Sequence, residues 1–170
     1  MLALIAAALA ASTPAPVLDA SVPWWERITV TVDDKGTEQS CRYESSLSAS
    51  GVEVCSAQVA AGSKSRSAPG PSGLYSKLTF ERRFSPGGKL DSGRLEPGDK
   101  LLARQVLFLT IDPTGAVGSC RVVATSGDVL PDYGCEEARA EKFRAQASAS
   151  EPARQAFMTV LVYGHTEQIA

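Results

Sequence analysis

Residues that usually carry chemistry are scarce in this sequence. It contains one histidine in 170 residues, and aromatic residues make up 6% of the chain. His165 has no matched serine, cysteine or carboxylate motif, so we expect a solvated side chain and not a catalytic base. The patterns of the nucleophile elbow, the zinc proteases, the dinucleotide-binding fold and the P-loop are absent. We therefore predict a non-enzymatic protein that needs no cofactor or metal ion. An enzyme would require a cleft between two modules.

Strong charge of one sign is also missing. The formal net charge is -2, and no cluster of lysine and arginine marks a nucleic-acid site or a membrane-surface patch. Residues 1–10 are apolar, but a membrane-spanning helix needs about 20 such residues. Because this run closes in Ala8-Leu9-Ala10, we predict a secretory signal peptide over residues 1–11. We expect the mature chain to be periplasmic and to lack a membrane span.

The sequence contains an internal repeat. Residues 32–42 reappear as residues 111–121, with Asp, Gly, Ser, Cys and Arg at identical places. After one inserted residue the match resumes, so that residues 78–80 correspond to residues 158–160. Each copy is long enough to form a small domain. The repeat predicts two modules and a polar, turn-rich linker: residues 23–84, residues 85–99 as the linker, and residues 100–165.

Each copy is predicted to run strand, strand, helix, strand. Alternation of apolar and polar residues with a period of two is typical of strands, whereas Ser50 with Glu53 fits a helical capping box. Asp132 is the expected cap of the second helix. The fold class that we predict is α+β, with two tandem ββαβ modules. The expected strands are residues 27–32, 37–44, 74–84, 101–111, 116–124 and 155–163, and the expected helices are residues 50–61 and 132–143.

The four cysteines fall at matching positions, two in each copy. Cys41 and Cys55 are 14 residues apart, and Cys120 and Cys135 are 15 apart. Closing a loop of about 15 residues stabilises a fold by roughly 3 kcal/mol in the chain-entropy model. Structural zinc prefers ligands two to four residues apart within a pair, and no redox C-x-x-C is present. We predict one disulfide in each copy, with zinc binding or pairing between copies as the alternatives.

Apolar side chains occupy both sides of the last strand. Phe157, Leu161 and Tyr163 lie on one side of the strand. The apolar residues on the other side are Met158, Val160 and Val162. One face can be covered by the helix of the same module, but the other face needs a second cover. That cover is either the first copy or a second chain, or else the face binds a ligand.

Two adjacent tryptophans precede the first strand. Trp24 and Trp25 are expected to be an apolar plug over a sheet edge, with carbohydrate stacking as the alternative.

The second copy resembles the C-terminal domain of the energy transducer TonB. That family combines an apolar strand, a D-x-x-G turn, a second strand ending in S-G, a helix ending in an aromatic residue and a last apolar strand. Residues 109–115, 120–127, 141–143 and 157–163 show this order here, and the likeness is greatest to cysteine-paired versions. The printed sequence shows neither the membrane anchor nor the proline-rich spacer of that family. We therefore do not expect this chain alone to transduce energy.

The resemblance implies a three-stranded antiparallel sheet with a helix on one face and the last strand at an edge. In the family this edge accepts an extended peptide from an outer-membrane receptor, by strand addition during envelope transport. The corresponding peptide-binding residues are Phe157, Thr159, Leu161 and Tyr163. The alternative is a disulfide-stapled structural or inhibitor protein of the cell envelope, in which a homodimer or the first copy closes this edge.

Overall fold

The computed structural model describes residues 16–33, 38–47, 55, 75–91 and 93–166. Among these residues, 57% lie in strands and 6% in helices. The elements in chain order are β1 (Val17–Leu18), β2 (Trp24–Val32), β3 (Glu38–Ser45), β4 (Lys77–Pro86), β5 (Asp99–Ile111), β6 (Val117–Gly127), α2 (Cys135–Ala140), β7 (Lys142–Phe143) and β8 (Arg154–His165). The predicted signal peptide (residues 1–11) lies outside the described residues, as does the first predicted helix (residues 50–61) apart from Cys55.

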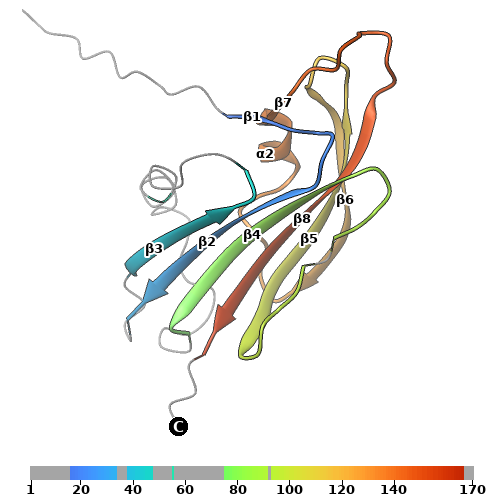
Figure 1. Cartoon of the computed structure of the whole chain (residues 1–170). Coiled ribbons are helices and arrows are strands. Elements are labelled where there is room, and N and C mark those ends of the chain that lie inside the picture. The colour runs from blue at the N-terminus through green and yellow to red at the C-terminus, as the bar shows by residue number, and fades with distance from the viewer. Residues whose placement is uncertain (1–15, 34–37, 48–54, 56–74, 92, 167–170) are drawn as a thin grey trace, which may run out of the picture.

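The two copies share one six-stranded sheet, in the order β3-β2-β4-β8-β5-β6 (Figure 1). The first copy contributes β3, β2 and β4, and the second contributes β8, β5 and β6. Their third strands, β4 and β8, pair antiparallel along ten residues of each. The predicted α+β fold of two ββαβ modules, each with its own sheet and helix, is therefore wrong. The modules share one sheet because their last strands each offer an unpaired edge and pair with one another. The described part of the chain is mostly β because its one helix, α2, has only six residues.

The strand order and the register are approximately twofold symmetric about the β4–β8 pair. Ile28 on β2 pairs with Phe80 on β4, and its repeat counterpart Leu107 on β5 pairs with Met158 on β8. Phe80 therefore corresponds to Met158, which shifts the third strands by two residues from the match that the repeat predicted. With this correspondence, the pair of Arg82 and Val160 lies at the symmetry centre.

The main core lies on one face of the sheet, which we call the helix face because α2 covers it. Trp24 stacks on Phe84 with ring centroids 5.3 Å apart, and Phe84 lies at the same distance from Phe143 on β7. Leu107 and Met158 are fully buried beside them. The short parallel pair of β1 with β7 closes this core next to α2.

The helix is shorter than predicted because the last residues of the predicted helix, 142–143, form β7 instead. It begins after Gly134, whose N–H donates to the Glu137 carboxylate at 2.8 Å, and not at Asp132. Glu141 takes an extended conformation, with φ -66° and ψ 151°. The chain then forms β7, which places Phe143 in the core. Packing of this aromatic ring thus outweighs the helical preference of the segment.

Both predicted disulfides are present. Cys41 is bonded to Cys55, and Cys120 to Cys135, so each bond anchors a following segment to the second strand of its copy. They are compatible with an oxidising, exported location. In the described part of the chain, no helix has the length and the apolar character that crossing a membrane requires.

Candidate functional site

A charged cluster on the helix face joins the two copies. Arg82 on β4 donates hydrogen bonds to the carboxylates of Glu26 on β2 and Glu141 after α2. Tyr133 donates to Glu141 at 3.1 Å, and Tyr43 donates to Glu26 at 3.0 Å. Arg82 therefore holds carboxylates from both copies at the symmetry centre of the sheet.

The surroundings keep Arg82 charged although its side chain is only 18% exposed. Burial alone would lower the pKa of Arg82, but Glu26 and Glu141 outweigh it and raise that pKa. The guanidinium also lies 5.4 Å from the ring of Trp24 and 5.1 Å from that of Tyr133. Burial, and then the nearby charge of Glu141, raises the pKa of Tyr133. The hydroxyl of Tyr133 therefore stays protonated and keeps donating at neutral pH.

A cavity of about 270 Å³ lies beside this cluster. Its walls combine an apolar floor with acidic side chains and one arginine, and its lining residues are Glu26, Ile28, Phe80, Glu81, Arg82, Tyr133, Glu137, Glu141 and Val160. Sites for drug-sized ligands usually measure about 300–1,000 Å³. Because Arg82 already binds two carboxylates, one from each copy, we interpret this region as an ion-pair cluster that joins the halves.

The opposite face of the sheet, here called the second face, holds another buried carboxylate. The side chain of Glu81 is 1% exposed and accepts hydrogen bonds from Arg27 at 2.8 Å, Tyr163 at 3.0 Å, and Arg83. Arg83 also bonds Asp91 at 2.7 Å, in the connection between β4 and β5. Burial raises the pKa of Tyr163, and the charge of Glu81 adds to this increase. Glu81 is therefore a satisfied structural acid without a free oxygen for catalysis.

His165, the one histidine, ends β8 and faces a carboxylate. Its Nδ1 lies 3.0 Å from Oδ1 of Asp99 at the start of β5, and the ring is 31% exposed. It is thus partly solvated, as expected, but it also has a partner. Among the described residues, no group of three or more His, Cys, Asp or Glu side chains is arranged to hold a metal ion.

The predicted peptide-binding residues lie on β8, which is a central strand. Phe157, Thr159, Leu161 and Tyr163 have β4 on one side and β5 on the other. Their side chains lie on the second face, where Phe157 contacts Phe108 with ring centroids 5.3 Å apart and Tyr163 bonds Glu81. The expectation that this strand forms an edge is therefore wrong, because the first copy occupies that edge through β4.

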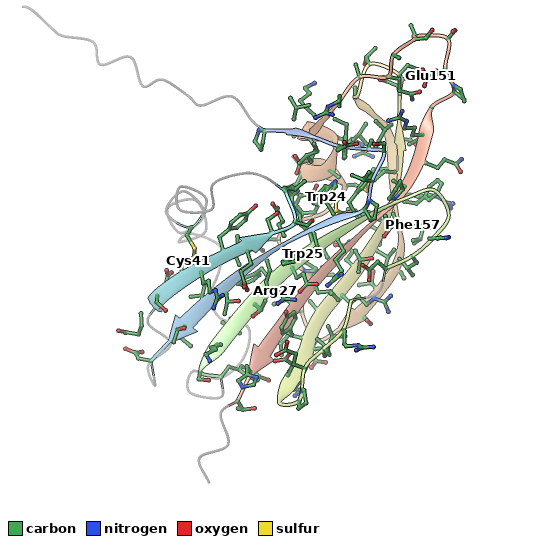
Figure 2. All side chains as sticks on the ribbon, in the orientation of Figure 1. Trp24, Trp25, Arg27, Cys41, Glu151 and Phe157 are labelled. Carbon is green, nitrogen blue, oxygen red and sulfur yellow. A yellow bond between two sulfur atoms is a disulfide. The ribbon has the colours of Figure 1, made fainter. Side chains whose placement is uncertain are left out.

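The two tryptophans begin β2 (Figure 2). Because successive side chains of a strand alternate, they point to opposite faces of the sheet. Trp24 belongs to the core of the helix face, and its indole N–H donates to the carbonyl of Asp19 at 3.0 Å. Trp25 lies on the second face, where the guanidinium of Arg27 is 5.4 Å from its ring. Trp24 thus belongs to the main core and is not the predicted plug over a sheet edge.

The outer edges of the sheet are β3 and β6, and they differ in charge. The eight residues of β3 include Glu38, Arg42 and Glu44, of which the last two form an ion pair at 3.0 Å. The eleven residues of β6 include a single charged side chain, Arg121. Two consecutive valines on β6 remain 46% and 42% exposed.

Edge strands that avoid pairing with other chains are usually short or charged. The long and weakly charged β6 is therefore the candidate binding edge. The sequence predicted this strand, but its place at an edge depends on the order of the strands in the sheet. The exposed valines were the one local signal that could have indicated it.

Comparisons with known proteins add no family or relative. No family model matches the chain, and neither the curated proteins nor the solved structures include a match. The resemblance to TonB C-terminal domains therefore stays a prediction from the sequence.

Proposed function

We propose that this chain is a non-enzymatic binding protein of the periplasm, and that it takes up an extended peptide by strand addition at β6. The observation that carries this proposal is the contrast between the strands of the second copy. The last strand, β8, has neighbours on both sides, whereas β6 is a long edge strand with exposed valines. In strand addition, main-chain hydrogen bonds supply affinity and alternate side chains supply selectivity.

The proposed cellular setting is supported by the sequence and by the disulfides. The predicted signal peptide supports export, and two disulfides suit an oxidising compartment. The resemblance to TonB C-terminal domains supports an outer-membrane receptor, or another envelope protein, as the source of the peptide. The site differs from the one implied by that resemblance, because β4 already occupies the open side of β8.

Amide hydrogen exchange combined with an NMR titration tests the proposal. Peptides from receptor N-termini are titrated into the labelled, disulfide-intact chain. Strand addition predicts chemical-shift changes along residues 117–127 and slower exchange at alternate amides of β6, because their outward N–H groups gain partners. The amides of β3 serve as the internal control and should not change. The proposal fails if saturating peptide leaves the exchange of β6 unaltered.

A second candidate function is a disulfide-stapled structural or inhibitor protein of the envelope that takes up no strand. The closure of β8 by β4 favours it, since it removes the edge that the family resemblance assigns to peptides. Unaltered exchange at β6 with every peptide would support this candidate, and sedimentation would then show whether the chain acts as a monomer or a dimer.

A further inference from the structure

The arginines of the two sheet halves have different partners. Arg27, Arg82 and Arg83 in the first copy all bond carboxylates, as does Arg42 at the β3 edge. By contrast, three arginines on or next to β6 take part in none of the ion pairs among the described residues. These are Arg104 on β5, Arg121 on β6 and Arg139 on α2, the last of which donates to the carbonyl of Cys120 at 3.3 Å.

Two of these arginines share the second face of the sheet. Arg121 is opposite Phe108, and its guanidinium lies 5.0 Å from that ring. Arg104 is four residues before Phe108 on β5, so both point to the same side of the pleat. β6 itself contains no acidic residue, and the nearest acids in sequence, Asp112, Asp128 and Asp132, lie beyond its two ends. The second face along β6 is therefore a cationic border of the sheet.

Arg104 can reach a strand added outside β6. Its partner on β6 is Ser126, an exposed residue. The small side chain of Ser126 does not block the Arg104 side chain from extending over β6 toward the edge of the sheet. The Nε of Arg104 is buried without a hydrogen-bond partner in the described part of the chain. A buried donor of this kind is stabilised when an acceptor approaches its guanidinium.

We infer that the peptide that adds to β6 is acidic, with two carboxylates on the second face, one near Arg121 and one near Arg104. The two arginines correspond to positions four residues apart on β5, so the matching acids stand at i and i+4 of an extended segment, roughly 13 Å apart. This inference rests on strand addition at β6 and specifies the class of its partner.

Fluorescence anisotropy with designed peptides tests it. The first peptide is rich in Val and Thr and carries Glu at i and i+4; the second has Gln at both places; the third has Glu at i and i+1, so that its two acids point to opposite faces. We expect the first to bind about five- to tenfold more tightly than either of the others at low salt. The advantage should shrink at high ionic strength.

Variants assign the preference to the arginines. Arg121→Gln should remove most of the advantage of the acidic peptide, and adding Arg104→Gln should remove the rest. Arg42→Gln is the matched control, because Arg42 holds the same repeat position on the other edge strand, and it should change nothing. Arg121 is exposed, so its variant tests the inference even if the Arg104 change impairs folding.

The outcomes separate this inference from the proposed function. Suppose that all three peptides bind with equal affinity in the anisotropy assay and also slow amide exchange at β6. Strand addition then stands, and the acidic preference is overturned. If none of them binds, both fall together. A preference for the acidic peptide that survives Arg121→Gln and the double change would overturn the assignment to these arginines.

Discussion

The two copies of the repeat place matching arginines in opposite surroundings. Arg42 on β3 has its guanidinium 3.0 Å from the carboxylate of Glu44, whereas Arg121 on β6 rests on the ring of Phe108. An edge strand with several charges resists pairing with another chain, and a weakly charged one invites it. The two copies therefore form a sheet whose outer edge strands differ in length and charge, while the inner edges of both copies pair with each other through β4 and β8.

The two copies also differ in how completely their core residues are buried. The largest predicted change in the free energy of unfolding tests this difference. Leu107 and Ile28 are repeat counterparts, but Leu107 is completely buried under α2, whereas Ile28 borders the cavity and is 7% exposed. Leu107→Ala should lower the free energy of unfolding by about 3–4 kcal/mol, because it removes contacts and leaves a void. Ile28→Ala should cost about 2 kcal/mol.

Urea unfolding of both variants, followed by circular dichroism, measures the two costs. The disulfides are kept intact so that the transitions compare the same unfolded state. Equal losses of unfolding free energy in the two variants would show that both halves of the sheet are packed equally well. That result would contradict the proposed asymmetry of the core.

The disulfides extend the comparison to the helix. Both bonds close loops of similar length, 14 and 15 residues, so loop entropy predicts about 3 kcal/mol for each. Cys120 and Cys135 also pack against the main core at the start of α2. Replacing that pair by alanine should therefore cost more than replacing Cys41 and Cys55.

Thermal unfolding of the two double variants measures this difference, with the reduced wild-type chain as the reference for loss of both bonds. A larger loss from the Cys41 and Cys55 pair would contradict the view that the second copy is the more stable half.

Much of the local structure of both copies was predictable, because its signals are local. The strand at residues 27–32 follows from alternating apolar and polar residues, and its counterpart at 101–111 follows from the repeat. Both disulfides follow from equal spacing within the repeat. The fold class was not predictable in this way. The pairing of β4 with β8 joins residues far apart in the sequence, and alternation does not state which strand will be its neighbour.

The charged residues of β4 show the same limit. Glu81, Arg82 and Arg83 are consecutive in the sequence and resemble a solvated segment, yet β4 is central and all three form ion pairs. Glu81 and Arg82 pair with residues of β2, and Arg83 pairs with Glu81 and with Asp91 after β4. The apolar residues on both sides of β8 did indicate that a second cover was needed. They did not indicate that this cover would be a neighbouring strand of the first copy.

The buried carboxylate on the second face gives a test of intermediate size. Glu81→Gln keeps the shape of the side chain but removes the charge that Arg27 and Arg83 share, and we expect a loss of about 2 kcal/mol. Glu44→Gln, at the exposed β3 edge, breaks a single surface pair and should cost less than about 1 kcal/mol. Chemical unfolding at pH 7 compares them. Similar losses would mean that the cluster at Glu81 contributes no more than a surface ion pair.

The smallest predicted effect concerns the connection between the copies and its dependence on pH. Burial would raise the pKa of Asp91, but hydrogen bonds from the Gly93 N–H and from Arg83 outweigh it and lower that pKa below its usual value of 3.8. A group whose pKa is lower in the folded state stabilises the fold above its unfolded pKa, and this contribution is lost as the pH falls through the folded value. Asp91→Asn should therefore destabilise the chain at pH 7 by less than about 1 kcal/mol, since the side chain of Asp91 is 47% exposed.

The same change should make less difference as the pH falls through the lowered pKa of Asp91, because the wild-type carboxyl then becomes protonated itself. Unfolding free energies from pH 7 to pH 2.5, measured for the wild type and Asp91→Asn, check both ends of this range. The remaining acid sensitivity should come from other groups with lowered pKa values, such as Asp19 and Asp112. A gap between the two proteins that does not narrow as the pH falls would show that the ion pair of Asp91 with Arg83 does not hold the connection on the sheet. The two copies would then be joined by the β4–β8 pair and the Arg82 cluster alone.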